Sequence, residues 1–211
     1  MTDRCVLVLL DRPGWAPPGV DAQAWRRALA EDVVDLLAPL AEVDVALAAT
    51  AADRPLAEDI RWPTTPVYEV TAARPVAALT AVARAGYRQA AVLPADLPDL
   101  PALLIGKLFR ALSDRAVAAA PRLPDRADLA ALASRLPVPE WLVTADPALT
   151  GTDQAGLRAA GRTVPDAPPH GDVAACPGWH RLRGPADLTR LDESLEGWEA
   201  TRALLATGSV R

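Results

Sequence analysis

The chain has 211 residues, 51% of them hydrophobic and 23% charged, and its formal net charge at pH 7 is −5. This length and composition provide a core large enough for one globular domain and exclude an intrinsically disordered chain. The negative net charge gives the protein no overall basic field, which argues against nucleic acid as a partner.

Two features of the chain indicate its compartment. The apolar run that begins at Cys5 is too short to span a membrane, and no signal-peptide cleavage site follows it. The two cysteines, Cys5 and Cys176, lie far apart and lack the spacing of a zinc site, so we expect both to be free thiols. The sequence therefore predicts a cytoplasmic protein with no membrane partner.

The first 120 residues alternate between apolar runs and helical patterns. The first apolar run ends at Asp11-Arg12-Pro13-Gly14, and Asp21 is placed to cap the helix that follows. Later apolar runs predict buried strands, and periodic segments predict helices. The predicted strands are 5–10, 43–49, 66–70, 89–93 and 116–120, and the predicted helices are 22–40, 75–85 and one that begins near residue 101.

The second half is less regular. Residues 121–139 are rich in Pro, Arg and Asp. The predicted elements from here on are a short helix at 127–135, a strand at 141–144, a helix at 152–160, a loop at 165–178, a last strand at 179–182 and an amphipathic closing helix at 185–205. Strand and helix alternation without a linker predicts a single three-layer α/β domain, residues 1–211, with a mainly parallel sheet. Its sites are expected beyond the carboxyl ends of the strands.

The segment AAVLPADLPDLPALLIGKL, residues 90–108, places an acidic loop between an apolar strand and a helix. It resembles the metal-binding loop of the GT-A-like nucleotidyltransferase and nucleotide-diphospho-sugar transferase superfamily. That superfamily includes 2-phospho-lactate and molybdenum-cofactor guanylyltransferases and small bacterial glycosyltransferase-like proteins. The resemblance covers roughly residues 4–120 and implies their fold, with residues 1–120 as the nucleotide side and residues 121–211 as the acceptor side and closing helix.

The resemblance also implies a nucleotide site. Asp96 would bind Mg²⁺ or Mn²⁺ bridging the nucleotide phosphates, although an Asp in this loop also fits a turn or a helix cap. Asp99 is a weaker candidate for a metal ligand and fits the N-cap of the following helix better. Because LLDRPG is similar to the start of the loop after the first strand in one bacterial branch, Arg12 and Gly14 would lie beside the bound nucleotide.

Three segments depart from the family pattern. Residues 15–19, Trp-Ala-Pro-Pro-Gly, stand where the bacterial branch has Lys-Thr-Arg, and residues 118–129 lack an Asp-Gly-Gly or Gly-Thr-Asn segment. Arg183 stands where a second metal ligand is common. Two functions therefore stay open. The chain is a metal-dependent nucleotidyltransferase or glycosyltransferase-like enzyme using a nucleoside triphosphate or nucleotide sugar, or a catalytically inactive relative that serves as a binding or assembly protein.

The remaining polar and aromatic residues have simpler interpretations. The six tryptophans are interpreted as rings that cover loose ends of the core, and a pocket or partner surface is the alternative for Trp15, Trp62 and Trp179, which lie in predicted loops. His170 and His180 are the only histidines, and neither lies in a recognised catalytic setting. Two arginine groups are interpreted as solvated helix and strand ends: Arg26-Arg27 and Arg181/Arg183.

Overall fold

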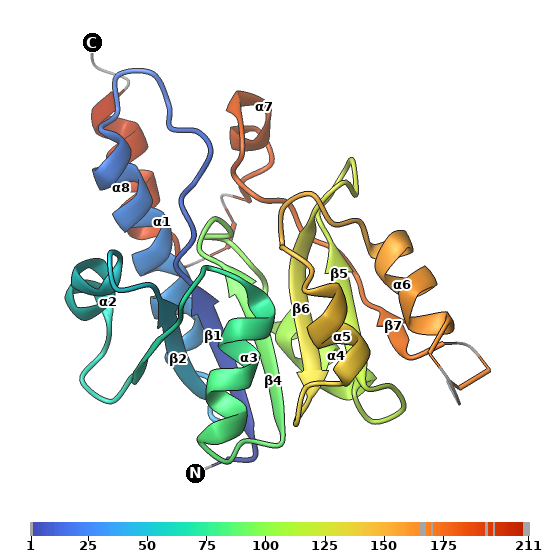
Figure 1. Ribbon diagram of the computed structural model, residues 1–211. Helices are drawn as coiled ribbons and strands as arrows, with labels where there is room; N and C mark the ends of the chain where they lie inside the picture. The colour runs from blue at the N-terminus through green and yellow to red at the C-terminus, as the bar shows by residue number, and fades with distance from the viewer. Residues whose placement is uncertain (1, 165–167, 170, 193, 196, 209–211) are drawn as a thin grey trace.

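The computed structural model describes residues 2–164, 168–169, 171–192, 194–195 and 197–208. A seven-stranded sheet with the strand order β3-β2-β1-β4-β6-β5-β7 lies at its centre (Figure 1). The strands are β1 (Arg4–Leu9), β2 (Asp44–Ala49), β3 (Val67–Glu69), β4 (Gln89–Pro94), β5 (Val117–Pro121), β6 (Leu129–Arg135) and β7 (Val173–Ala175).

Neighbouring strands run parallel except at β6, which is antiparallel to both β4 and β5. Leu9, at the end of β1, is in register with Pro94, at the end of β4. The loops after these two strands therefore start side by side. We call the edge of the sheet where β1, β2, β4 and β5 end, and where the antiparallel β6 begins, the carboxyl edge.

Helices cover both faces of the sheet and complete three layers (Figure 1). The helices are α1 (Ala22–Leu37), α2 (Arg54–Ile60), α3 (Pro75–Arg84), α4 (Ala102–Ala111), α5 (Glu140–Ala145), α6 (Gln154–Arg162), α7 (Pro185–Leu188) and α8 (Glu199–Gly208). One core packs Val6 and Val8 with α1, α2 and α4, and the other packs Cys5 and Leu7 with α3, α5 and α6. The predicted three-layer, mainly parallel α/β fold is confirmed.

The first 120 residues form the predicted elements because their local signals agree with their tertiary surroundings. Successive residues of β1 face opposite cores, which explains its unbroken apolar run. Asp21 caps α1 as predicted, since its Oδ1 accepts the backbone N–H groups of Gln23 and Ala24 at 3.0 and 2.9 Å. Helix α2 is an addition, because seven residues are too few to display a helical repeat in the sequence.

Strand β6 replaces the helix predicted over residues 127–135. Its sequence, LAALASR, is rich in Ala and Leu, which favour helices. Six of its seven residues are buried, and the strand pairs on both sides, with β4 and β5. A strand covered on both faces needs no polar alternation, so tertiary pairing overrides the local propensity.

Four more predictions for the second half are wrong. Residues 140–145 form α5 instead of a strand, because Pro139 precedes the helix and Glu140 favours its first turn. β7 lies within the predicted loop 165–178, and residues 179–182 join the sheet only through a bridge between Trp179 and Arg122. The closing segment is divided into α7 and α8, and Gly197, just before α8, has a positive φ of 102° that a continuous helix does not allow.

Other predictions have mixed outcomes. Cys5 and Cys176 are free thiols as predicted, while His170 lies outside the described residues. Trp25 is fully buried and packs edge to face with Trp15, as expected for rings that cover the core, whereas Trp62 is half exposed. Across the ranges that the structure describes, no helix has both the length and the apolar character needed to cross a bilayer.

A carboxylate on α1 holds the start of α8. Asp32, 2% exposed, accepts the backbone N–H groups of Ala200 and Thr201 at 2.9 and 2.8 Å. Burial raises the pKa of Asp32 from 3.8 to about 6, more than these hydrogen bonds lower it. The folded protein therefore binds a proton at Asp32 more tightly than the unfolded chain does. This contribution to stability is present below pH 4 and is lost as the pH rises through about 6.

Asp32→Asn removes this titration. We compare the free energies of unfolding of the wild type and the variant. Between pH 4 and pH 7 the wild type should lose on the order of 2 kcal/mol relative to the variant. Urea unfolding at a series of pH values measures the difference. Glu42→Gln, at an exposed position, is the control and should follow the wild type at every pH. A difference that stays constant or grows with pH would contradict the prediction.

Candidate functional site

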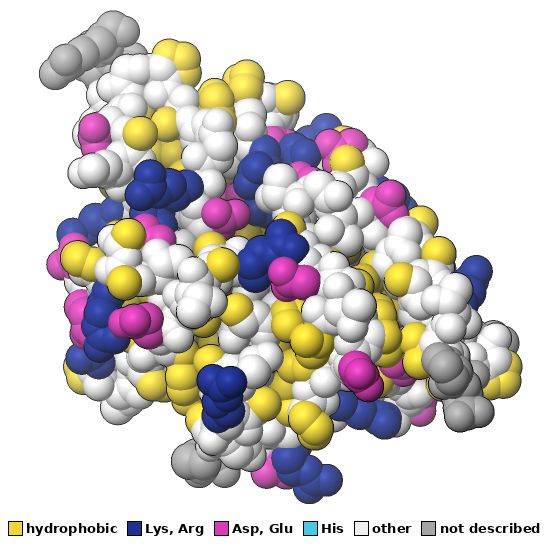
Figure 2. All heavy atoms as spheres, in the orientation of Figure 1, with side chains coloured by type: hydrophobic (Ala, Val, Ile, Leu, Met, Phe, Trp, Pro, Cys, Tyr) yellow, Lys and Arg dark blue, Asp and Glu magenta, His cyan; other side chains and the backbone are white. Residues whose placement is uncertain are grey.

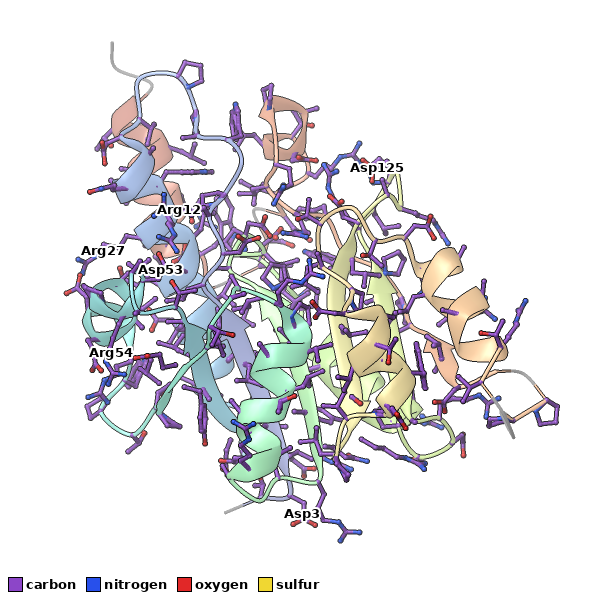
Figure 3. All side chains as sticks on the ribbon, in the orientation of Figure 1. Asp3, Arg12, Arg27, Asp53, Arg54 and Asp125 are labelled. Atoms are coloured by element: carbon purple, nitrogen blue, oxygen red, sulfur yellow. The ribbon has the colours of Figure 1, made fainter. Side chains whose placement is uncertain are left out.

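Charged side chains from several segments meet at the carboxyl edge. Arg12 follows β1, Asp53 follows β2, Asp96 follows β4 and Arg122 follows β5. Figure 3 shows Arg12 beside Asp53 at this edge and Asp3 at the opposite edge. In the space-filling view, basic and acidic side chains lie next to one another over the upper ends of the strands (Figure 2). The edge is therefore a mixed field of charges and not an apolar pocket.

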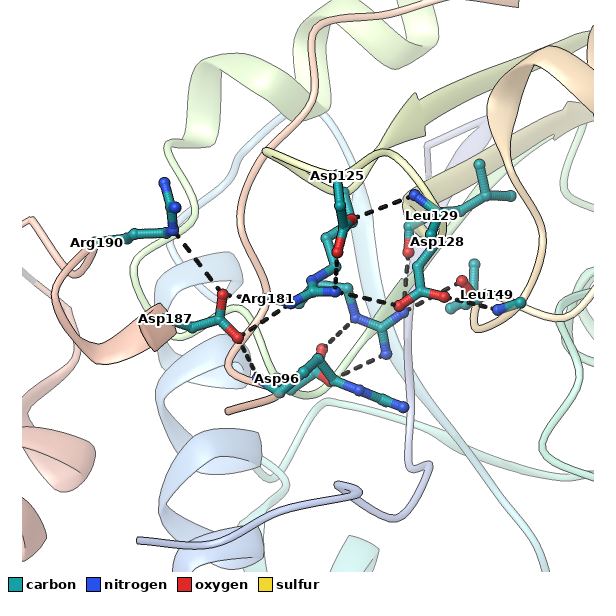
Figure 4. Close-up of polar contacts among 12 residues, drawn as sticks. Asp96, Asp125, Asp128, Leu129, Leu149, Arg181, Asp187 and Arg190 are labelled. Carbon is teal, nitrogen blue, oxygen red and sulfur yellow. Dashed lines mark hydrogen bonds and ion pairs between the residues drawn. The ribbon is translucent and has the colours of Figure 1, made fainter. Parts of the chain in front are cut away.

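Asp96 forms a buried ion pair with Arg181. Arg181 donates from Nε to Oδ1 at 2.7 Å and from Nη2 to Oδ2 at 3.0 Å, so one guanidinium holds both carboxylate oxygens (Figure 4). Asp96 is 3% exposed and Arg181 is 0% exposed. This two-bond arrangement is the one that a planar guanidinium matches best. The charge of Asp96 is thus balanced inside the protein.

The remaining contacts fix Arg181 in place. Its Nη1 donates to the carbonyl oxygens of Leu129 at 3.0 Å and Leu149 at 3.3 Å. The backbone N–H of Leu182 donates to the carbonyl oxygen of Asp96 at 2.9 Å. Burial acts to lower the pKa of Arg181, but the Asp96 carboxylate raises it, and the net direction is upward. Arg181 is therefore a permanent cation that ties residues 179–183 to the acidic loop.

A small recess opens beside this ion pair. Its volume of about 10 Å³ gives room for roughly one water molecule. Pro13, Leu29, Pro94 and Ala95 form part of its wall. Its charged walls are four arginines and two aspartates: Arg12, Arg26, Arg181, Arg183, Asp11 and Asp96. Because the positive charges outnumber the negative ones, the recess favours an anion.

Arg12 and Arg183 carry the donors that are still free at the recess. Among the described residues, the guanidinium of Arg12 makes no hydrogen bond or ion pair, and it is exposed. Arg183 reaches Asp96 only from Nη1 to Oδ2, at 3.4 Å. Gly14 lies against it, since a Cβ at Gly14 would stand 3.6 Å from Arg183 Nη2. Two guanidinium groups are thus available to a ligand beside a position with no side chain.

Arg26 has a structural role at the same recess. Its Nη1 donates to Oδ1 of Asp53 at 2.7 Å, and its Nη2 and Nε donate to the carbonyl oxygens of Leu10 and Asp11 at 3.1 and 3.3 Å. Burial acts to raise the pKa of Asp53, but hydrogen bonds from Arg26 and Thr50 lower it below the usual range. Arg26 therefore joins α1 to the ends of β1 and β2.

A second charge network surrounds Arg122. Its Nη2 donates to both carboxylate oxygens of Asp187, at 3.3 and 3.1 Å, and its Nη1 lies 2.8 Å from Asp125 and 3.7 Å from Asp128. The three aspartates are labelled in Figure 4. Asp187 also accepts the backbone N–H of Arg183 at 2.9 Å. The network therefore holds the backbone at Arg183 against the loop between β5 and β6.

Asp99 is fully buried and is not the cap of α4, whose N-cap is Pro101. Its Oδ1 accepts the indole N–H of Trp179 at 3.2 Å, and its Oδ2 accepts the backbone N–H of Asp192 at 3.1 Å. Nε2 of His180 lies 3.0 Å from Oδ1 but is not aligned for a hydrogen bond. Asp99 therefore faces the C-terminal segment and lies off the recess.

Comparison of the structure with solved structures gives consistent matches along the whole chain. A candidate nucleotide-diphospho-sugar transferase from Desulfovibrio desulfuricans matches with a TM-score of 0.64 at 16% identity, covering 99% of this chain and 98% of that one. A 4-diphosphocytidyl-2C-methyl-D-erythritol synthase from Anaerococcus prevotii matches with a TM-score of 0.59 at 13% identity, covering 89% and 95%. The chain has the nucleotide-diphospho-sugar transferase fold.

A third structure with this nucleotide-diphospho-sugar transferase fold is a CMP:2-keto-3-deoxy-manno-octonic acid synthetase in complex with CTP. It matches with a TM-score of 0.56 at 12% identity, covering 97% of this chain and 98% of the synthetase. No protein-family model and no curated protein matches the sequence. At these identities the likeness establishes the fold and leaves the substrate open.

The residues at Asp96 do not fit the Mg²⁺ or Mn²⁺ ion that the resemblance implies. Both carboxylate oxygens already accept from arginine, and no group of three or more His, Cys, Asp or Glu within the described ranges could hold a metal. A divalent cation on Asp96 would lie within roughly 5 Å of the Arg181 guanidinium, where repulsion is on the order of several kcal/mol at an effective dielectric constant of about 20. Arg183 adds further positive charge at Asp96.

The structure places the predicted nucleotide-side residues together. Arg12 and Asp96 face the recess and Gly14 lies against Arg183, while their binding of a nucleotide stays a prediction. The interpretation of the arginine groups as solvated ends is wrong for Arg26 and Arg181, and correct for Arg27, whose side chain is 49% exposed. Sequence reasoning missed Arg181 because its partner is 85 residues away.

A wider groove of about 860 Å³ lies at the opposite edge of the sheet, away from these residues. Asp44 and Pro66, at the amino ends of β2 and β3, belong to its wall, and so does the half-exposed Trp62. None of the residues predicted for the nucleotide site lines it. In an open parallel sheet, ligand chemistry is expected at the carboxyl edge, so the smaller recess is the better candidate.

Proposed function

We propose that the chain is a transferase-like protein that binds the phosphate groups of a nucleoside triphosphate or nucleotide sugar at the carboxyl edge. One observation carries the proposal: two guanidinium groups with free donors, Arg12 and Arg183, flank the recess where the loops after β1 and β4 meet. Guanidinium forks match phosphate oxygens in shape and charge. The CTP complex of a synthetase with the same fold gives independent support for a nucleotide ligand.

As a transferase, the protein would use the two guanidinium groups to stabilise the negative charge of the leaving group. An acceptor oxygen attacks the α-phosphorus of a nucleoside triphosphate, or the anomeric carbon of a nucleotide sugar. Pyrophosphate or a nucleoside diphosphate then departs with its negative charge, which fixed cations stabilise. We assign residues 1–120 to the nucleotide side and residues 121–211 to the acceptor side of one domain. With both cysteines free, the cytoplasm is the compartment we propose.

A second candidate function is binding without catalysis. The observation that favours it is the ion pair of Asp96 with Arg181. Because of this pair, the acidic loop offers no free carboxylate at the recess, where the other carboxylate is that of Asp11. In this case the protein keeps the fold as a binding or assembly partner. The two functions share the ligand and differ in whether a product is formed.

A thermal-shift panel tests ligand binding. Nucleoside triphosphates and nucleotide sugars are added in turn, and a ligand bound only by the folded state raises the melting temperature. The matched variants are Gly14→Asp, whose carboxylate would pair with Arg183 and repel phosphate, and Gly14→Ala, whose methyl group fits the 3.6 Å space. We expect the shift to disappear in Gly14→Asp and to persist in Gly14→Ala. A panel with no shift for any nucleotide would refute the proposed function.

The same ligand then separates catalysis from binding. Each nucleotide that binds is incubated with a panel of sugar phosphates, and release of pyrophosphate or nucleoside diphosphate is measured. Release that is lost in Gly14→Asp would identify a transferase. Binding with no release above the protein-free background supports the inactive relative.

A further inference from the structure

We propose that this site takes its phosphate ligand in the metal-free form, with the Arg181 guanidinium fixed on Asp96 in place of a divalent cation. The inference rests on the proposed function and adds the chemical form of the ligand: a free polyphosphate anion and not its magnesium complex.

The first step concerns Arg181. Its guanidinium spans both oxygens of Asp96 at 2.7 and 3.0 Å and is fully buried. Its remaining nitrogen, Nη1, donates to two backbone carbonyl oxygens. Arg181 therefore occupies the position at Asp96 that a divalent cation would take, and it has little donor capacity left for a ligand. The Asp96–Arg181 pair has no net charge, so it offers no carboxylate to a metal, and the direct contacts to phosphate come from other side chains.

The second step concerns the direct contacts. Arg12 is exposed, and its guanidinium makes no hydrogen bond or ion pair in the part of the chain that the structure describes. Arg183 uses one nitrogen, Nη1, in a long hydrogen bond of 3.4 Å to Oδ2 of Asp96. Both can turn donors toward an oxyanion that approaches from the solvent side, and Gly14 leaves that approach open. Charge-assisted hydrogen bonds of this kind are the strong ones.

The third step is the charge balance. Arg26 is paired with Asp53 and Arg181 with Asp96, so Arg12 and Arg183 give an excess of positive charge over Asp11 before a ligand arrives. A free triphosphate brings the full negative charge that this excess favours. A magnesium complex of the same nucleotide carries two fewer negative charges and adds a cation close to Arg181. The free anion should therefore bind more tightly than the metal complex, which is the reverse of the order at a metal-dependent site.

Calorimetric titration tests this order. CTP, ATP, GTP, UTP and inorganic pyrophosphate are each titrated into the full chain, once with EDTA and once with Mg²⁺ or Mn²⁺ in excess. We expect at least one of them to bind in EDTA with a dissociation constant no higher than with the metal. Arg12→Gln and Arg183→Gln should each weaken binding in EDTA by about tenfold or more. Arg84→Gln, at an exposed position on α3, should leave it unchanged.

The outcomes are distinct. Binding that occurs in EDTA and depends on Arg12 and Arg183 supports the inference. Binding that appears only with Mg²⁺ or Mn²⁺, or that is tenfold tighter with them, overturns it while leaving the proposed function in place. Binding in EDTA that neither arginine variant weakens also overturns it. No binding of any probe in either buffer also overturns the inference, and the thermal-shift panel, which includes nucleotide sugars, then decides whether the proposed function stands.

Discussion

Replacing Arg181 by Met will destabilise the protein by about 3–5 kcal/mol, because it leaves the Asp96 carboxylate buried without its partner. Asp96 is 3% exposed, and Arg181 gives it two of its short hydrogen bonds. For a chain of this length the change corresponds to a melting temperature lower by roughly 6–20 °C. Urea unfolding followed by far-ultraviolet circular dichroism measures the free energy directly.

A double-mutant cycle supplies the control. Asp96→Asn removes the buried charge, so the double variant Asp96→Asn/Arg181→Met should recover most of the stability that Arg181→Met alone loses. Asp3→Asn, at a surface position whose one ion pair among the described residues is with the exposed Arg88, should have an effect below about 0.5 kcal/mol. If Arg181→Met proves as stable as the wild type, the pair does not neutralise the acidic loop, and Asp96 is free to take a metal.

Gly178→Ala will destabilise the protein by on the order of 3 kcal/mol, for a steric reason. A Cβ at Gly178 would lie 2.2 Å from the carbonyl oxygen of Pro121, and this oxygen accepts the backbone N–H of Trp179 at 3.2 Å. The chain must move away from β5 to make room, and that movement weakens the bridge between Trp179 and Arg122. Thermal unfolding measures the loss.

Gly184→Ala is the matched comparison for this substitution. Gly184 has extended backbone geometry (φ −172°), and no atom lies within 4 Å of a Cβ built there. A change of a few tenths of a kcal/mol is expected. Since the displaced segment carries Arg181, Gly178→Ala should also weaken nucleotide binding, whereas Gly184→Ala should not. Equal stabilities for the two variants would show that the contact at Pro121 relaxes without cost.

Local patterns were sufficient for most elements of the first half of the chain, and the short helix α2 is the exception. The apolar run of β1, the cap at Asp21 and the strand before Asp96 are short-range signals, and each agrees with the packing around it. β6 shows where this reasoning fails, because an Ala-rich strand covered on both faces has the composition of a helix. Only its pairing with β4 and β5 decides between the two.

The location of the candidate site was predictable from the sequence, but its charge was not. The Asp96 loop and its position after a buried strand were readable from the sequence, and Arg12 and Gly14 do lie nearby. The neutralisation of Asp96 was not readable, because Arg181 comes from another part of the chain and has no local motif. The one available signal was Arg183, an arginine at a position where the family pattern has a ligand. Asp99 was misassigned for the same reason, since its partners Trp179 and His180 are also distant.

The separation between Asp96 and Arg181 also has a consequence for biosynthesis. The two residues are 85 positions apart, and a ribosome adding about 5–20 residues per second needs roughly 4–17 s to cover that distance. During this interval the nascent acidic loop carries an uncompensated carboxylate at the end of β4, and it is open to any dissolved cation. Arg181 pairs with the Asp96 carboxylate only after the strands of the sheet have been translated. A ribosome stalled before residue 181 would therefore expose a loop that differs in charge from the one in the finished protein.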